Sequence, residues 1–284
     1  MSKYYPDISH HHPVGDWEKI KNNCPFIITK ATEGTTYVDP TLDTVIKECE
    51  KRKTPYWLYT FLRDGNELDQ AKFMVETCKD KIGDCFVGYI LDIEQNNAPA
   101  NCQKALDYLS GLDYKIMIYT MYAQYALYKT LIDNRPEDCA WWEARYGLND
   151  GTYSNKYPCH SGADLHQFTS SGTCPGISDK IDMNRITGQG KKESWFMTTV
   201  DEEYVEGRED GVPYFAKIKS KATTTITQFL HNRGFGAGTP NLSKIAALNC
   251  DSPEVKAALF ALAQKGLLKK PDGLNKWQKK TTSQ

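Results

Sequence analysis

Residues 86–94 read Phe-Val-Gly-Tyr-Ile-Leu-Asp-Ile-Glu. The first six residues are apolar, aromatic or small, which is typical of a strand buried on both faces of a parallel sheet. The run then places two acids, Asp92 and Glu94, two residues apart. Side chains at such spacing share one face of a strand, with their Cα atoms roughly 6.6 Å apart. The stretch therefore predicts a buried strand that presents two carboxyls at its carboxyl end.

Strand-like and helix-like segments alternate on both sides of this stretch. Apolar residues spaced by three and four, as at Leu42, Ile46 and Cys49, predict amphipathic helices between the early strands. After about Leu131 the helices stop, and later strand-like runs are separated by connections rich in Gly, Ser, Asn and Pro. The expected strands cover residues 4–8, 26–30, 56–61, 86–93, 115–120, 140–145, 163–168 and 180–184. This order predicts an α/β fold, an incomplete TIM-like barrel with five βα units followed by three strands.

The composition limits the classes of protein to consider. The chain has 284 residues, 40% of them hydrophobic, which is enough for a large core. A net charge of −1 excludes a globally basic nucleic-acid binder. The apolar runs are strand-sized, so no membrane span is expected, and the N-terminus lacks the pattern of a secretory signal. We therefore expect synthesis in a cytoplasm.

Charge divides the chain into unequal parts. Residues 1–190 carry a net charge of −6, and residues 191–284 carry +5. Within the second part, 191–211 is acidic and 212–284 carries +9. Ser252-Pro253 is a helix start signal, and the spacing of the apolar residues after it continues a helix. We expect a barrel over 1–190, an acidic linker over 191–211, and a small, mainly helical module over 212–284.

The cysteines and histidines do not indicate a metal or another cofactor. Nine cysteines run from Cys24 to Cys250 without a C-x-x-C pair, which favours reduced, buried thiols over a disulfide framework or a zinc cluster. The triplet His10-His11-His12 cannot direct three consecutive rings at one ion, so a polar loop at the rim of the site is the favoured interpretation. One of these rings, His12, is a candidate for contact with substrate.

Carboxyls cluster where the expected strands end. Besides Asp92 and Glu94, Asp7 follows the first strand and Asp182 lies in the last. In such barrels the functional side chains gather at the carboxyl ends of the strands. Carboxyls that share one site titrate at different pH values, so one donates a proton beside an ionised partner, as glycoside cleavage requires. The alternative is that Asp92 and Glu94 only cap a helix or pair with a basic residue.

Aromatic and polar residues at the same strand ends are candidates for binding sugar rings. Roughly half of the aromatic residues are expected to belong to the core instead. Glu33, after the second strand, either assists the site or pairs with Lys30. The candidates for substrate binding are Tyr59, Phe61, Tyr119, Trp142, Tyr146, Gln167, His12 and Glu33.

An ordered series of motifs over about residues 3–188 resembles the family 25 glycoside hydrolases. The motifs are Asp7-Ile-Ser, Asp16-Trp17, Ile28-Thr-Lys-Ala-Thr-Glu-Gly34, Tyr37-Val-Asp39, Tyr59-x-Phe61, Leu91-Asp-Ile-Glu94, Trp142-x-Ala-x-Tyr146-Gly, His166-Gln167 and Ile181-Asp-x-Asn184. The family contains lysozymes that cut the β-1,4 bond between N-acetylmuramic acid and N-acetylglucosamine of bacterial peptidoglycan. The resemblance implies that Glu94 is the proton donor and that Asp92 holds the substrate's N-acetyl group or stabilises positive charge. It assigns Asp7 and Asp182 to tuning and positioning.

The resemblance leaves several alternatives open. Retention assisted by the acetamido oxygen and a route through added water both fit the family. Two departures, His12 in place of Gln and Thr60 in place of His, are expected to alter the rim of the site. A non-catalytic wall-binding protein and a glycosidase of another N-acetylated glycan are the rival functions.

The module at 212–284 has no family match of its own. A lysozyme followed by a small module resembles a bacteriophage endolysin, released from the host cytoplasm through a holin pore. The +9 charge predicts binding to anionic wall polymers, and oligomerisation is the alternative. Lys192-Glu193 can be encoded by a ribosome-binding sequence ahead of Met197. A free C-terminal fragment starting at Met197 that associates with the full chain is therefore a further expectation.

Overall fold

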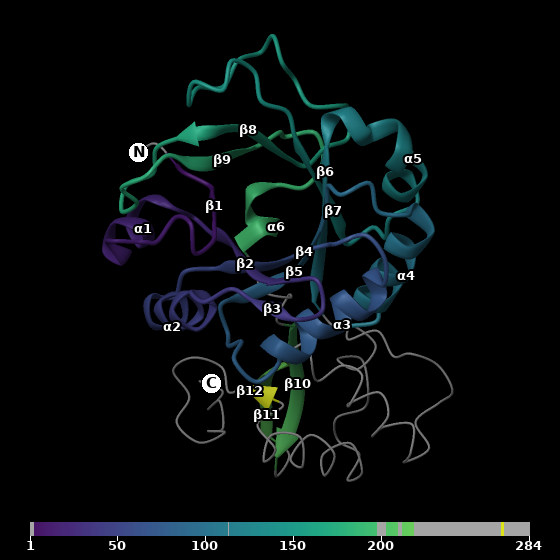
Figure 1. The fold of residues 1–284 in the computed structure, drawn as a ribbon. Helices are drawn as coiled ribbons and strands as arrows, with labels where there is room; N and C mark the ends of the chain where they lie inside the picture. Colours follow the sequence, from purple (N-terminus) through teal and green to yellow (C-terminus); the bar gives the residue numbers. More distant parts are fainter. Residues whose placement is uncertain (1–2, 113, 198–202, 210–211, 219–267, 270–284) are drawn as a thin grey trace. The chain divides into compact units, whose positions relative to one another are not determined.

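The structure is a computed structural model that describes residues 3–112, 114–197, 203–209, 212–218 and 268–269 (Figure 1). Contacts divide the chain into two units, Met1–Thr199 and Val200–Gln284. Each unit is described by itself. Among the described residues, no helix has the length and apolarity to cross a bilayer.

The first unit is built on a closed sheet of eight strands. Six neighbouring pairs are parallel, from β1–β2 round to β7–β8, whereas β9 runs antiparallel to both β8 and β1. A short strand β3 (Tyr37–Val38) adds to the end of β2. The barrel strands are β1 (Pro6–Ile8), β2 (Ile27–Glu33), β4 (Tyr56–Phe61), β5 (Phe86–Ile93), β6 (Lys115–Met121), β7 (Cys139–Ala144), β8 (Leu165–Gly172) and β9 (Ile181–Ile186). All eight predicted strands are confirmed.

Helices follow the first five barrel strands and cover the outside of the sheet (Figure 1). They are α1 (Trp17–Asn23), α2 (Leu42–Arg52), α3 (Glu67–Cys78), α4 (Pro99–Ser110), and α5 (Tyr125–Asp133), which is preceded by the 3-10 turn η1 (Tyr122–Gln124). The predicted face of α2 is buried at Leu42, Ile46 and Cys49. The five βα units followed by three strands are thus confirmed.

Alternation along the strands creates two apolar layers. One layer lies between the strands and the surrounding helices, and the other fills the barrel with side chains such as Phe26, Trp57 and Ile90. Strand β5 is buried along its whole length, as predicted. Gly88 in this strand is required by close approach, since a Cβ there would lie 2.0 Å from the carbonyl oxygen of Lys115 in β6.

A short helix, α6 (Glu193–Met197), closes the barrel at the amino ends of its parallel strands. Phe196 is fully buried and stacks on Phe26, and its carbonyl oxygen accepts a 2.9 Å hydrogen bond from the indole of Trp57. The expected acidic linker at 191–211 therefore differs from the structure. Its first part belongs to the barrel because Trp195-Phe196-Met197 packs against the barrel core. Net charge alone does not reveal this apolar contact.

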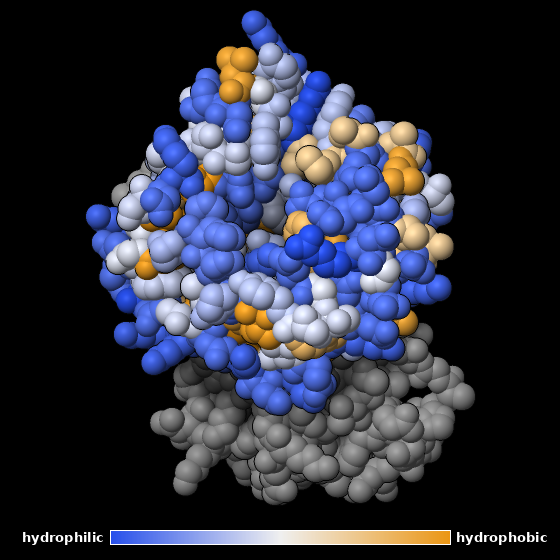
Figure 2. All heavy atoms as spheres, in the orientation of Figure 1, coloured by the Kyte–Doolittle hydropathy of each residue, from blue (hydrophilic) through white to orange (hydrophobic). Residues whose placement is uncertain are grey.

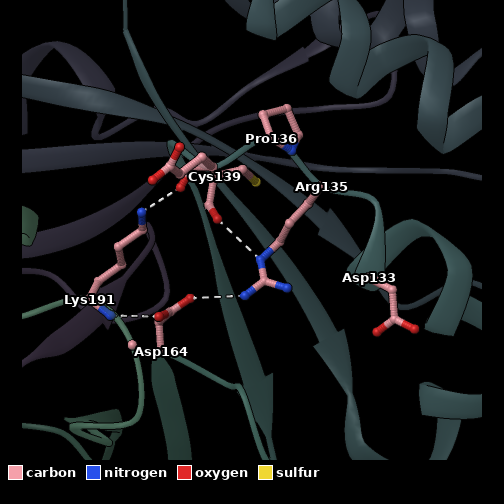
Figure 3. A pocket seen from close by; sticks show the side chains of 8 residues that line it. Asp133, Arg135, Pro136, Cys139, Asp164 and Lys191 are labelled. Carbon is pink, nitrogen blue, oxygen red and sulfur yellow. Dashed lines mark hydrogen bonds and ion pairs between the residues drawn. The ribbon is translucent and has the colours of Figure 1, made fainter.

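A pocket of about 370 Å³ lies near α6, at the start of β7 and beside Asp164. The buried Asp164 accepts hydrogen bonds from the backbone amide of Lys191 and from Arg135 (Figure 3). The backbone amide of Trp141 also donates to it. None of the four predicted acids lines this pocket. The face of the molecule seen in Figure 2 is largely hydrophilic, with hydrophobic residues in small separate groups.

In the second unit, the described residues form a separate antiparallel sheet. Strand β10 (Glu203–Glu209) pairs with β11 (Val212–Ile218), which pairs with β12 (Leu268–Lys269). The predicted helices of the module, including the one after Ser252, lie outside the described residues.

Candidate active site

The four predicted acids meet at the carboxyl ends of the parallel strands. Asp7 lies in β1 and Asp92 in β5, while Glu94 directly follows β5. Asp182 lies at the start of β9, and because β9 is antiparallel, its start reaches the same end of the barrel. Asp7 and Asp182 are Cα partners in the β1–β9 pair. Electrostatic interactions join Glu94 to each of the other three carboxyls, so the structure brings all four together.

Asp92 and Glu94 form a closely coupled pair. Asp92 is 6% exposed, and its Oδ1 has no hydrogen-bond partner among the described residues. Burial and the neighbouring Glu94 raise the pKa of Asp92 well above its ordinary value. Burial also raises the pKa of the half-buried Glu94, against the opposing effects of Asp92 and Lys30. Two adjacent carboxyls of this kind titrate as a coupled pair and can share a proton.

Asp7 is held by two amide side chains. Asn184 in β9 donates a 2.7 Å hydrogen bond to Asp7 Oδ2, and Gln167 in β8 donates to both carboxyl oxygens at 3.2 and 3.1 Å. We call Asn184 and Gln167 the amide clamp. Because amide N–H groups only donate, the clamp favours the ionised form of Asp7.

Three further side chains fix the orientation of the clamp. The indole of Trp142 donates to Asn184 Oδ1 at 2.8 Å, and indole N–H has no acceptor capacity. The hydroxyls of Tyr119 and Tyr146 donate to Gln167 Oε1 at 3.0 and 2.6 Å. Since both amide oxygens are occupied by donors, both NH₂ groups face Asp7. The sequence did not predict this role for Trp142, Tyr119 and Gln167, because their partners lie far away along the chain.

Asp7 and Asp182 have different pKa values although they lie opposite each other. Burial raises the pKa of Asp7 to about 6, with the amide clamp limiting the rise and Glu94 adding to it. Burial, Asp7 and Glu94 raise the pKa of Asp182 to about 8, and no amide in the described part of the chain opposes the rise. At neutral pH, Asp7 is therefore mainly ionised and Asp182 mainly protonated.

The turn that carries Glu94 is tied to its surroundings on several sides. The amide of Gln124, in η1, donates to the Glu94 carbonyl at 3.1 Å and to Asn96 Oδ1 at 3.0 Å. Tyr128 donates to the carbonyl of Asn97 at 3.1 Å. Sequence reasoning missed these residues, and the polar run Gln95-Asn96-Asn97 after an apolar strand is the signal that points to a structured turn.

The model of glycosyl hydrolases family 25 matches residues 6–177, which include most of the barrel. The chain belongs to this family.

Relatives of this family 25 chain include an autolytic lysozyme of Clostridium acetobutylicum, which is 25% identical over 61% of this chain and 52% of the relative. A lysozyme of Streptococcus phage Cp-9 is 28% identical over 60% of this chain and 53% of the relative. The chain thus matches about half the length of these curated relatives. The catalytic domain of an endolysin from a Listeria monocytogenes bacteriophage is similar in fold, with a TM-score of 0.57 at 24% identity over 69% of this chain and 96% of the domain.

Most of the predicted binding residues of this family 25 chain gather at the acid end, with different exposures. Tyr146 is 39% exposed, Tyr59 and Phe61 are half-buried, and Tyr119 and Trp142 are buried. Burial raises the pKa of the Tyr59 hydroxyl, and Asp92, Asp7 and Asp182 add to the rise. Tyr59 therefore lies near these acids. The expectation that some aromatics serve the core is confirmed for Trp142 and Tyr119, which pack within the barrel.

Glu33 pairs with basic side chains, which was one of its two predicted roles. It is bonded to Lys30 and Arg63, and although burial opposes ionisation, these two cations lower the pKa of Glu33. Lys30 in turn lies 5.2 Å from the ring centre of Phe61. Glu33 therefore holds the cation that acts electrostatically on Asp92 and Glu94.

The remaining rim residues behave differently from one another. His10 is bonded to the buried Asp39 at 2.9 Å, while His12 is half-buried, and burial and His11 lower the pKa of His12. Thr60 was expected at the rim, but its fully buried hydroxyl accepts a 2.9 Å hydrogen bond from Thr32. Neighbouring residues of a strand point to opposite faces, so Thr60 points away from the side that Tyr59 and Phe61 share. In the described part of the chain, no group of three or more His, Cys, Asp or Glu is arranged to hold a metal ion.

Proposed function

We propose that this chain hydrolyses the β-1,4 bond between N-acetylmuramic acid and N-acetylglucosamine in peptidoglycan. The observation that carries the proposal is the convergence of four carboxyls with different pKa values at the carboxyl end of a family 25 barrel. The names of its lysozyme relatives support the same substrate.

Glu94 is the proton donor in this proposal. It follows the buried strand and is more exposed than Asp92, so it is the member of the pair that a glycosidic oxygen reaches. Burial raises its pKa, which favours the protonated form that a proton donor needs, and Gln124 holds the turn in place. Donation to the departing sugar oxygen leaves Glu94 ionised, ready to take a proton from the attacking water in a later step.

Asp92 acts beside the reacting carbon. Among the residues that the structure describes, none bonds to its Oδ1, so this atom can accept a hydrogen bond from the N–H of the substrate's acetamido group. Such a bond orients the acetamido oxygen toward the anomeric carbon and stabilises the positive charge that develops there. This arrangement supports retention assisted by the acetamido group, in which the substrate supplies the nucleophile.

Asp7 and Asp182 provide fixed electrostatics. The clamped, ionised Asp7 contributes negative charge toward an oxocarbenium-like transition state, and the protonated Asp182 beside it donates a hydrogen bond. Tyr59, Phe61, Tyr146 and His12 contact the sugars directly. Tyr119, Trp142 and Gln167 act through Asp7 and are positioning residues, and Glu33 acts through Lys30.

Glu94→Gln tests the assignment of the acid. The substitution keeps the size of the side chain but cannot supply the proton, so we expect the rate of cell-wall clearing to fall about 10²- to 10⁴-fold while binding to purified walls persists. Glu76→Gln is the matched control, because Glu76 is a 71% exposed residue of α3. An unchanged clearing rate in Glu94→Gln removes Glu94 from the acid role.

We further propose that the enzyme serves lysis of a bacterial host by a phage, with synthesis in the cytoplasm and release through a holin pore. A phage lysozyme among the relatives supports this setting. Residues 212–284 are proposed to bind anionic wall polymers through their net charge of +9. Retention of full wall binding after deletion of residues 200–284 would contradict that assignment.

Met197 is proposed as a second translation start that yields a free copy of the C-terminal module. Lys192-Glu193, which can be encoded by a ribosome-binding sequence, lies at a suitable spacing before it. Expression of Met197→Leu tests this. A C-terminal fragment should disappear on a gel, and its persistence would exclude the start.

A further inference from the structure

Two buried thiols touch where the first and last parts of the barrel meet. Cys24 follows α1, and Cys174 lies in the connection between β8 and β9, 150 residues later. Each residue is 3% exposed, and their sulfurs are 3.5 Å apart. Both side chains belong to the apolar layer outside the barrel strands. A reduced pair at this distance needs only about 1.5 Å of approach to reach disulfide length.

The backbone holds the two segments together independently of the sulfurs. The carbonyl oxygen of Gly176 accepts hydrogen bonds from the amides of Gly15 and Asp16 at 2.9 and 3.0 Å, and Val14 forms a β-bridge with Ile177. Gly176 has φ +100, and a Cβ there would lie 2.5 Å from the carbonyl of Asp16. The sulfur contact is therefore built into a tightly packed junction.

We propose that Cys24 and Cys174 are an oxidisable pair that forms an intramolecular disulfide when a low-molecular-weight disulfide is present. The thiolate of one cysteine attacks the S–S bond of the reagent, forms a mixed disulfide and releases one reagent thiol. The thiolate of the other cysteine then attacks the protein sulfur and releases the second reagent thiol. Two protein thiols are oxidised, one reagent disulfide is reduced, and two protons leave the protein.

Oxidation of this pair is slow at neutral pH. The contact with Cys174 and burial raise the pKa of the Cys24 thiol, so little thiolate is present. The rate rises with pH and with local opening of the junction.

The disulfide would crosslink two segments of the barrel that are far apart in the sequence. It joins the segment between α1 and β2 to the β8–β9 connection, next to the β1–β9 pair that closes the sheet. A crosslink that closes so long a loop restricts the unfolded chain strongly. The oxidised barrel should therefore resist unfolding better than the reduced barrel, whatever its substrate.

Peptide mapping of the full chain tests the proposal. Reduced protein is incubated at pH 8 with oxidised glutathione, free thiols are blocked, and the protein is digested with trypsin without reduction. Cys24 falls in the peptide 22–30, and Cys174 falls in the peptide 157–180, which also contains Cys159. We expect a linked species of these two peptides in the wild type and in Cys159→Ser, and none in Cys174→Ala.

Thermal unfolding supplies the second readout. Oxidation should raise the Tm of the wild type by about 5 °C or more, and it should leave the Tm of Cys174→Ala unchanged. Cys159→Ser should show the wild-type increase. Two results would overturn the proposal: no linked peptide in the wild type after oxidation, or a link that persists in Cys174→Ala and is lost in Cys159→Ser.

Discussion

Asp7 and Asp182 are direct Cα partners across the antiparallel β1–β9 pair that closes the barrel, yet only Asp7 is held by amide donors. Like charges at opposed positions of a sheet repel each other, so one carboxyl of such a pair stays protonated. The amide clamp determines which of the two carboxyls is ionised. Its donors stabilise the ionised form of Asp7, and the proton remains on Asp182.

This division predicts the effect of Asp182→Asn on stability. The pKa of Asp182 in the folded chain, about 8, lies above its ordinary value of 3.8. Protonated Asp182 therefore favours folding, and this contribution is complete below about pH 4 and is lost as the pH rises toward 8. Asp182→Asn should raise the free energy of unfolding at pH 8 by on the order of 5 kcal/mol and leave it nearly unchanged at pH 4. Urea unfolding at the two pH values measures the difference, and an equal effect at both would contradict it.

The clamp predicts a change in the pH profile of Trp142→Phe. Loss of the indole donor lets the amide of Asn184 turn, which weakens its bond to Asp7. The pKa of Asp7 should rise, so the acidic limb of kcat/KM against pH should move to higher pH, with a loss of about 10-fold near pH 6. Trp141→Phe is the matched control, because the indole of Trp141 donates to Thr120 instead. The same shift in both variants would show that the effect is general loosening of the barrel.

The burial of α6 predicts where the chain can be cut. A fragment ending at Thr199 keeps Phe196 against Trp57, whereas a fragment ending at residue 190 opens the amino end of the barrel. We expect the 1–199 fragment to unfold cooperatively near the Tm of the barrel in the full-length chain. The 1–190 fragment, which lacks Phe196, should be less stable by about 3–5 kcal/mol. Phe196→Ala in the 1–199 fragment should reproduce most of that loss. Equal stability of the two fragments would place the boundary at 190.

Much of this fold could be predicted from the sequence because its signals are local. Each βα unit carries its own periodicity, and the strand over 86–93 is apolar on both faces, so the five units and the three later strands follow from short windows. The acids could be found because each stands at the end of a strand-like run. The grouping of Asp92 with Glu94 needed only the two-residue repeat of a strand.

The rest depended on partners that are distant along the chain. Nothing near Gln167 indicates that its amide faces Asp7, 160 residues away. The antiparallel direction of β9, which places Asp182 opposite Asp7, has no local signal either. Two other differences have simpler reasons. Thr60 was assigned to the wrong face of its strand. The short apolar stretch that forms α6 lies among charged residues, so the charge pattern indicated a linker there.

Mass spectrometry of digested peptidoglycan tests the central claim most directly. Purified walls are digested with the wild type and with Glu94→Gln, and the sugar that carries each new reducing end is identified. The proposed function predicts N-acetylmuramic acid at the new reducing ends with the wild type and almost no new ends with Glu94→Gln. New reducing ends on N-acetylglucosamine, or no new ends with the folded wild type, would contradict it.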